Sequence, residues 1–140
     1  MLEALSANEI AVSGLRAQRI RMDIIANNLA NVSTTRTEGG GGAFRRQMVL
    51  MRGESVGRSG PRNEGGVQVK RIVSDMSPLR PVYDPSHPDA NDDGFVEYPN
   101  IDVAVEMVDL ISAQRAYEAN IAVIANGKRM KQQALRIIEK

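Results

Sequence analysis

The chain has 140 residues, enough for one domain, and combines 42% hydrophobic residues with only 4% aromatic residues. Its formal net charge of +1 gives no overall field that would attract nucleic acid or an acidic membrane surface, so neither partner is predicted. The absence of cysteine excludes disulfides and thiol chemistry. No stretch approaches the run of about 18 apolar residues that spans a bilayer, so direct membrane insertion is not predicted either.

The first 34 residues are predicted to form an N-terminal core helix. Their apolar positions step by alternating threes and fours, which indicates a helix from about Ser6 or earlier to near Val32. Asn31-Val-Ser-Thr34 then breaks the pattern, because these side chains compete for backbone hydrogen bonds and favour helix ends. The predicted seam residues of this helix are Leu15, Met22, Ile25, Leu29 and Val32.

Residues 35–99 are predicted to be a Gly/Pro-rich insert without a core of its own. Nine of the twelve glycines fall between residues 39 and 66. Residues 77–90 contain four prolines, which keep this segment extended and non-helical. Three stretches have strand character, and they predict a small β element, a hairpin with a third strand: Phe44–Met51, Gly66–Val73 and Phe95–Tyr98.

Residues 100–140 are predicted to form a second long helix that begins after Pro99 and is capped by Asn100 or Asp102. A 3.5-residue repeat keeps one seam facing a partner helix, as in coiled coils. The fold is therefore predicted to be mainly α with a small β insert, with the two terminal helices packed as a coiled-coil-like pair. The repeat runs through Val103, Met107, Leu110, Gln114, Tyr117, Ile121, Ile124, Lys128, Lys131, Leu135 and Ile138.

Pairing of the two helices within one chain is predicted to be marginal. Burial of the seam and the entropy lost in ordering two long helices nearly cancel. Packing of many copies side by side would favour the ordered state. We therefore expect the termini to be largely unfolded or loosely helical in the isolated monomer and to order on assembly. An ordinary intramolecular helix pair is the alternative.

The charges are segregated along the chain. Residues 36–80 contain nine basic and four acidic side chains, residues 81–109 contain eight acidic and no basic ones, and residues 110–140 contain six basic and two acidic. Complementary blocks of this kind suit head-to-tail contacts between copies, because they steer association and penalise wrong registers. The alternative is a set of solvated loops whose charges happen to cluster.

No catalytic site and no cofactor are predicted, so the chain is not expected to be an enzyme. The single histidine, His87, lies in a proline-rich turn, with no cysteine or second histidine to share a metal. The segment Asp89–Asn100 matches an EF-hand calcium loop at five positions, but Asn100 stands where the bidentate glutamate is required. We therefore prefer an Asp/Asn/Gly turn leading into the Phe95 strand, with calcium binding as the alternative.

Specific residues also carry a family resemblance, which covers nearly the whole chain and is weakest from Gly53 to Gly66. Asn27-Asn28-Leu29-Ala30-Asn31-Val-Ser-Thr34 resembles the Asn-Asn-x-Ala-Asn-x-x-Thr signature of the bacterial flagellar rod and hook proteins. A second set of segments is similar to the short proximal-rod members of that family: His87-Pro-Asp-Ala-Asn91, Tyr98-Pro-Asn100, Glu106-Met-Val108 and Ile111 to Asn120.

The resemblance implies a structural subunit of the basal-body rod, in the periplasmic space. Its terminal helices would pack around a central export channel, with the middle segment facing outward, and the rod would act as a drive shaft. The implied partners are copies of itself, other rod proteins of the FlgB, FlgF, FlgG and FliE types, the membrane ring and the flagellar type III export apparatus. Export without a cleaved leader is implied as well. It agrees with the N-terminal sequence Met1-Leu-Glu-Ala-Leu-Ser6, which lacks the features of a secretory signal.

By position, the resemblance also implies subunit-interface roles. The seam residues would contact neighbours, and four polar residues would hydrogen-bond at the end of the first helix and fix where the chain turns outward: Asn27, Asn28, Asn31 and Thr34. Arg115, Tyr117 and Asn120 would bridge subunits. Family members tend to carry alanine or valine where this chain has Gly127, a departure that bears on whether the second helix is straight there. Two other function classes stay open, a calcium-dependent extracellular binding module and a cytoplasmic helical adaptor.

Overall fold

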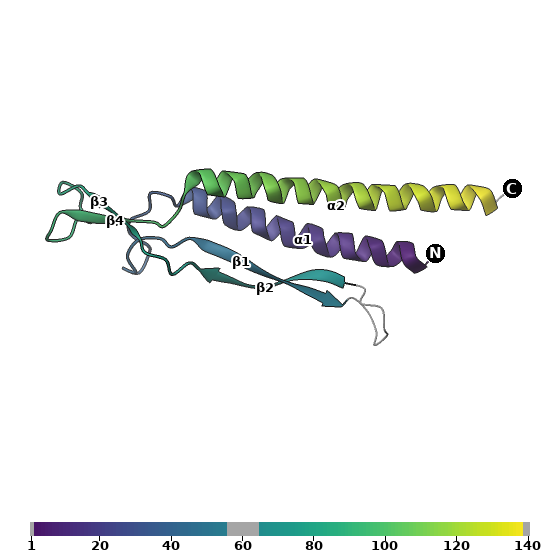
Figure 1. Ribbon diagram of the computed structural model, residues 1–140, viewed down its shortest axis with the longest axis horizontal. Coiled ribbons are helices and arrows are strands. Elements are labelled where there is room, and N and C mark those ends of the chain that lie inside the picture. The colour runs from purple at the N-terminus through teal and green to yellow at the C-terminus, as the bar shows by residue number, and fades with distance from the viewer. Residues whose placement is uncertain (1, 56–64, 139–140) are drawn as a thin grey trace.

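The computed structural model describes residues 2–55 and 65–138, and the side chains of residues 7–53 and 65–137. The molecule is elongated, with both chain termini at one end and a small hairpin at the other (Figure 1). The elements in chain order are α1 (Leu2–Ala30), β1 (Gln47–Ser55), β2 (Gly65–Ser74), β3 (Arg80–Tyr83), β4 (Phe95–Tyr98) and α2 (Val103–Ile138).

The two long terminal helices pack against each other in opposite directions, which confirms the predicted fold class (Figure 1). Of the two predicted caps of α2, Asp102 is the one used. Its Oδ1 accepts hydrogen bonds from the backbone nitrogens of Ala104 at 2.8 Å and Val105 at 3.3 Å. Asn100 instead accepts a bond from the backbone nitrogen of Arg46 at 3.0 Å, which ties the start of α2 to the segment before β1.

The residues of α2 that face α1 form the seam between the helices. Every second one of these seam residues differs from the predicted one. The side of α2 that faces α1 carries two interleaved seven-residue series: Glu106, Ala113, Asn120 and Gly127, and Leu110, Tyr117 and Ile124. The series Leu110, Tyr117 and Ile124 was predicted. In place of each residue of the other series, the apolar repeat predicted the residue that follows it in the sequence. Two of these following residues, Met107 and Ile121, are each 46% exposed.

Small and polar residues occupy the first series because the helices approach closely there. A Cβ atom on Gly127 would lie 2.7 Å from Asn8 Oδ1, and one on Gly14 would lie 2.9 Å from the side-chain amide of Asn120. The absence of a side chain at each glycine therefore leaves room for an asparagine side chain of the opposite helix. The helix α2 runs through Gly127 without interruption, so the departure at this position accommodates Asn8 rather than breaking the helix.

The insert forms two separate two-stranded antiparallel sheets, where a single hairpin with a third strand was predicted. β1 pairs with β2 from Gln47↔Ser74 to Ser55↔Gly65, and β3 pairs with β4 from Arg80↔Tyr98 to Tyr83↔Phe95. The strand β3 escaped prediction because it contains Pro81, a residue that a sheet tolerates only on an edge strand or at a strand end. In a two-stranded sheet every strand is an edge.

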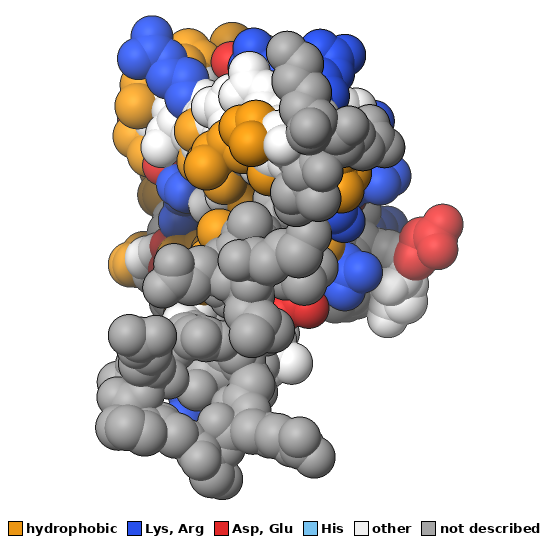
Figure 2. All heavy atoms as spheres, turned by 90° about the vertical axis from the view of Figure 1, so that its right-hand side faces the viewer, with side chains coloured by type: hydrophobic (Ala, Val, Ile, Leu, Met, Phe, Trp, Pro, Cys, Tyr) orange, Lys and Arg blue, Asp and Glu red, His pale blue; other side chains and the backbone are white. Residues whose placement is uncertain are grey.

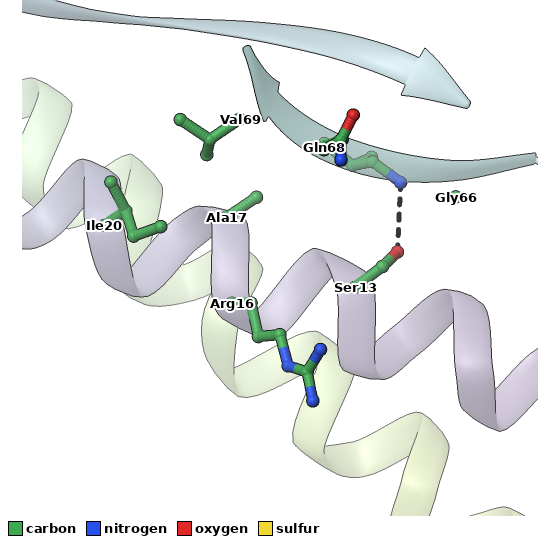
Figure 3. Close-up of a pocket in the computed structure, with 8 residues that line it drawn as sticks. Ser13, Arg16, Ala17, Ile20, Gly66, Gln68 and Val69 are labelled. Atoms are coloured by element: carbon green, nitrogen blue, oxygen red, sulfur yellow. Dashed lines mark hydrogen bonds between the residues drawn. The ribbon is translucent and has the colours of Figure 1, made fainter. Parts of the chain in front are cut away.

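The β1–β2 hairpin packs on the face of α1 opposite to α2, so α1 is the middle layer of the helical half (Figure 1). Ser13 Oγ accepts a hydrogen bond of 3.0 Å from the backbone nitrogen of Val67 (Figure 3). Beside this bond lies a groove of about 350 Å³ between α1 and β2, over the buried Ala17. In the part of the chain that the structure describes, neither helix is long and apolar enough to cross a membrane.

Candidate functional site

A polar cluster with two buried members, Asn28 and Glu106, joins the end of α1, the start of β1 and the first turns of α2. We call it the polar junction and define it as Asn28, Arg46, Gln47, Glu106 and Asp109. Asn28 is 1% exposed, and its side chain pairs with the backbone of Gln47 as a neighbouring strand would. Its Nδ2 donates to the Gln47 carbonyl and its Oδ1 accepts from the Gln47 nitrogen, both at 2.9 Å.

Glu106 is the centre of the polar junction and is fully buried. Its Oε2 accepts a bond of 2.9 Å from Asn28 Nδ2, and its Oε1 accepts one of 2.6 Å from Arg46 Nε. Asp109 lies beside this pair, with one carboxylate oxygen 3.5 Å from Arg46 Nη2 and the other 3.1 Å from Arg21 Nη2. Because both oxygens of the Glu106 carboxylate are already bonded, the group is suited to holding elements together rather than to transferring protons.

The remaining polar residues of the predicted motif lie directly beside the junction. Asn27 Nδ2 donates to Gln47 Oε1 at 3.3 Å, and Asn31 Nδ2 donates to Asn27 Oδ1 at 3.0 Å. Thr34 Oγ1 in turn donates to Asn31 Oδ1 at 3.1 Å, while the Thr34 carbonyl accepts from the Phe44 nitrogen at 3.0 Å. This chain of bonds closes the end of α1 and starts the loop that returns to β1.

Two strips of apolar side chains flank the seam on α2 and are open to solvent. At 100° per residue, the first flank lies on one side of the seam and the second flank on the other. Their side chains are 46% to 75% exposed. Large apolar side chains that gather in the open on two sides of a helix indicate candidate interaction surfaces. The first flank is Val103, Met107, Ile111 and Ile121, and the second flank is Val105, Val108, Val123, Met130 and Ile137.

The total accessible surface leads to the same conclusion. It is 10248 Å², whereas a compact monomer of this mass exposes roughly 7,100 Å². The difference, about 3,000 Å², is several times the 800 Å² or so that one partner contributes to a standard interface. Hydrophobic side chains also lie in the open between Lys and Arg side chains at the end of the molecule that holds the helix termini (Figure 2). The isolated chain therefore displays surface that assembly would cover.

Comparison with known proteins identifies the class of assembly. Residues 9–36 match the family described as flagella basal body rod protein, and residues 92–137 match the flagellar basal body rod FlgEFG protein C-terminal family. The flagellar basal-body rod protein FlgC of Borreliella burgdorferi is 45% identical, over 96% of this chain and 97% of the relative. Those of Bacillus subtilis and Salmonella typhimurium are 43% and 35% identical, over at least 95% of each chain. The chain belongs to the FlgC family.

FlgC-family membership makes the chain a structural, non-enzymatic subunit of the flagellar basal-body rod that assembles with other rod subunits. The two matched segments contain the polar side chains of the junction from α1 and α2. They also contain both flanks of α2. The helical residues of the junction and the flanks that the chain offers to neighbours therefore lie in the parts that match the rod families, whereas Arg46 and Gln47 lie between the two matched segments.

The predicted interface residues fall into two environments, buried and exposed, and one further residue has a side chain that the structure does not describe. Residues buried or half-buried within the chain are Leu15, Met22, Ile25, Asn28, Leu29, Asn31, Val32, Thr34, Leu110, Tyr117, Asn120 and Ile124. Residues exposed to solvent are Asn27, Val103, Met107, Arg115, Ile121 and Leu135. The side chain of Ile138 lies outside the described residues.

Sequence reasoning missed the junction residues Arg46, Gln47 and Asp109, which lie outside both apolar repeats. It named Glu106 only within the segment Glu106-Met-Val108 that carries the family resemblance. A signal was present, because Glu106 opens a seven-residue series of small and polar residues that faces α1. A charged residue in such a series indicates a buried partner on the opposite helix.

The Asp89 loop forms the preferred turn. Asn91 Oδ1 accepts a bond of 2.8 Å from the Phe95 nitrogen, and Gly94 has a φ of +83°, as a turn into a strand requires. Asp89 forms an ion pair with Arg36 across to the loop after α1. Among the described residues, no three His, Asp or Glu side chains are placed to hold a metal ion together. The loop therefore ties the insert to the end of α1.

Proposed function

We propose that this FlgC-family subunit polymerises through its terminal helices into a hollow shaft that transmits torque and encloses an export channel. The observation that carries the proposal is the presence of two separate apolar flanks on α2. One flank would suffice for a two-fold dimer. Two different flanks require two different neighbours, and such heterologous contacts repeat into a ring or a helical array.

From Glu118 onward, the side of α2 between the two flanks is polar and suits a water-filled channel. It carries Glu118, Asn126 and Arg129, all exposed, with the small Ala122 among them. In an array whose flanks are covered by neighbours, this side would line the bore. The β1–β2 hairpin, which lies on the far side of α1 from α2, would then face outward.

The interface residues divide into contact and support roles in this proposal. Residues that contact neighbouring subunits are Val103, Met107, Arg115, Ile121, Leu135 and Ile138. Residues that hold the helix pair on which the contacts are displayed are Leu15, Met22, Ile25, Leu29, Val32, Leu110, Tyr117, Asn120 and Ile124. Asn27, Asn28, Asn31 and Thr34 fix the point where the chain leaves the shaft wall.

We assign three parts to the chain in the assembled rod: the N-terminal core helix 1–34, the insert 35–99 and the C-terminal core helix 100–140. Its finer partners would be further copies, rod proteins of the FlgB, FlgF, FlgG and FliE types, the membrane ring and the type III export apparatus. Every described side chain of α2 beyond Gly127 is exposed in the monomer. We therefore expect the outer ends of both helices to order on assembly.

Two neighbouring positions on α2 provide a matched test. Ile121 lies on the first flank, and Ala122 lies on the polar side one residue later; both are exposed. In a bacterium whose own gene copy is replaced, Ile121→Asp should abolish rod assembly and swimming, because it places a charge in a dry contact. Ala122→Asp should preserve both.

Both variants should be secreted as soluble monomers with the wild-type circular dichroism spectrum, which separates an assembly defect from a folding defect. Basal bodies purified from each strain report incorporation directly. Wild-type swimming with Ile121→Asp would contradict the assignment of the first flank. Loss of assembly with both variants would contradict the assignment of the polar side to the channel.

A further inference from the structure

Each terminal helix contains a single glycine, and each of these glycines lies opposite an asparagine of the other helix. Asn120 of α2 lies against Gly14 of α1, and Asn8 of α1 lies against Gly127 of α2. Glycine destabilises the interior of a helix relative to alanine, so its use at both positions needs a packing reason. The two contacts supply that reason, because each asparagine occupies the space that a glycine leaves free.

The contact between Gly14 and Asn120 is the stricter of the two. A Cβ atom on Gly14 would lie 2.9 Å from both the nitrogen and the oxygen of the Asn120 amide. Asn120 Nδ2 donates a bond of 2.8 Å to the carbonyl of Ala116 on its own helix, so the amide is held in this position. A Cβ atom on Gly127 would lie 2.7 Å from Asn8 Oδ1 but 3.4 Å from its Nδ2, so a small turn of that amide relieves the contact.

The polar junction fixes the rotation of α2 about its axis only at the inner end, at Glu106. The seam series that begins there repeats every seven residues, whereas a straight α-helix drifts by about 20° over seven residues. The drift is about 40° at Asn120, two repeats further out, and about 60° at Gly127, three repeats further out. Each flank is centred roughly 90–100° from this series, at 100° per residue. Without a second fixed point, the outer half of α2 would therefore turn a flank more than half of the way toward α1.

We propose that the two asparagine–glycine contacts set the rotation of the outer half of α2, the half nearer the chain termini (Figure 1), and so direct its two flanks toward neighbouring subunits. The inference rests on the proposed function, because this rotation affects assembly only if the flanks are the lateral contacts. The residues involved position the flanks and belong to neither of them.

The contacts select one rotation because each fits only at a position without a side chain. Gly14 is the single such position on α1, so a rotated α2 would move the Asn120 amide against a β-carbon of α1. Asn8 and Gly127 repeat this restriction one seven-residue repeat further out, with the roles of the two helices exchanged. A single asparagine in the seam of a coiled coil fixes the register of its helices in a similar way.

The melting temperature of the purified chain tests the stricter contact through the sign of one effect. Helix propensity alone predicts that Gly14→Ala raises it. The proposal predicts a fall of about 3 °C or more, because the new Cβ meets an amide that is held in place. Adding Asn120→Ala should reverse the fall, since it removes that amide. Adding Asn8→Ala, the same substitution at the other contact, should not reverse it.

Paired spin labels measure the rotation itself, and the chain has no cysteine that would interfere with labelling. Double electron–electron resonance should give a narrow distribution of distances for each of two label pairs in the otherwise unchanged chain. Replacing both Asn8 and Asn120 by alanine should shift or broaden the outer distribution by several ångströms. The inner distribution and the helical content should not change. The outer pair is Glu9→Cys with Ala125→Cys and the inner pair is Asp23→Cys with Ala104→Cys, all at exposed positions.

In flagellated cells, the same double replacement of Asn8 and Asn120 should reduce swimming and incorporation into basal bodies, while the chain is still secreted. Four results would overturn the inference: a higher melting temperature for Gly14→Ala, equal rescue by Asn8→Ala and Asn120→Ala, an unchanged outer distance distribution, or normal incorporation of the double variant. In each case, loss of assembly with Ile121→Asp would leave the proposed function standing. Normal assembly with Ile121→Asp would instead count against the proposed function itself.

Discussion

Replacement of Glu106 by alanine tests whether the polar junction holds the two helices and β1 together. The change removes a fully buried carboxylate that accepts one bond from Asn28 and one from Arg46. Removing one partner of a buried ion pair costs about 3–5 kcal/mol. Arg46 keeps some compensation, because its side chain is 20% exposed and has Asp109 at 3.5 Å. We therefore expect a loss of about 2–4 kcal/mol in the free energy of unfolding.

The loss can be measured by urea unfolding of the purified chain, followed by far-ultraviolet circular dichroism. Glu106→Gln keeps the shape and one acceptor oxygen, so it should lose less, about 1–2 kcal/mol. Glu118→Ala, at an exposed position of the same helix, should change stability by less than about 0.5 kcal/mol. Against a typical total stability of about 5–15 kcal/mol, the effect of Glu106→Ala is large.

A double-mutant cycle with Arg46→Ala isolates the ion pair from the rest of the junction. If the two residues act as one unit, the double variant should lose clearly less stability than the sum of the two single losses. Strict additivity, or a loss below about 1 kcal/mol for Glu106→Ala, would refute the reasoning. The junction would then be an incidental feature of the fold.

Three further predictions concern single positions. Asp102→Ala removes the cap of α2 and should cost about 1 kcal/mol in urea unfolding, whereas Asp102→Ser should restore most of it. Gly94→Ala should cost more than about 1 kcal/mol and lower the melting temperature, because it combines a positive φ with a Cβ only 2.9 Å from the Tyr83 ring. The Ser77 hydroxyl and backbone nitrogen donate to Asp75 and hold the pKa of that carboxyl below its usual 3.8. The resulting stability is present above pH 3.8 and is lost as the pH falls through the lowered pKa, so Ser77→Ala should move the NMR titration of Asp75 upward.

The helices were predictable because a long apolar repeat and a polar stop define them without tertiary information. Half of the α2 seam could not be predicted from the sequence. Glu106, Ala113, Asn120 and Gly127 face α1 because the two helices approach each other closely there. At two of these positions an apolar count prefers the residue one position later, Met107 or Ile121, and the monomer exposes both. Sequence periodicity therefore confused the intramolecular seam with an adjacent solvent-exposed flank.

The polar junction could not be predicted as a cluster, because its members come from three segments that meet only in the folded chain. Asn28 was identified by its motif, and Glu106 stood in a segment of the family resemblance. Arg46, however, stands in the predicted strand Phe44–Met51, where nothing indicated a partner on either helix. The charge blocks were visible in the sequence, but the sequence did not show which charges pair inside the chain. Arg46 with Glu106 and Arg36 with Asp89 pair inside the chain, whereas Asp92, Asp93 and Glu97 and the basic side chains of the last described turns of α2 are exposed.

The distribution of buried groups relates this architecture to a mechanical role. The buried aliphatic side chains of the described residues are alanines, apart from Ile25, Val96 and Ile101. The largest fully buried side chain of any type belongs to the charged residue Glu106. A small apolar core stabilises an isolated chain weakly, whereas a hydrogen-bonded junction fixes the direction in which the insert leaves the helices. Most large apolar side chains of α2 remain available for contacts between subunits. In a shaft under torque, the load is carried across those contacts, so stiffness depends on the assembly more than on the core of any one subunit.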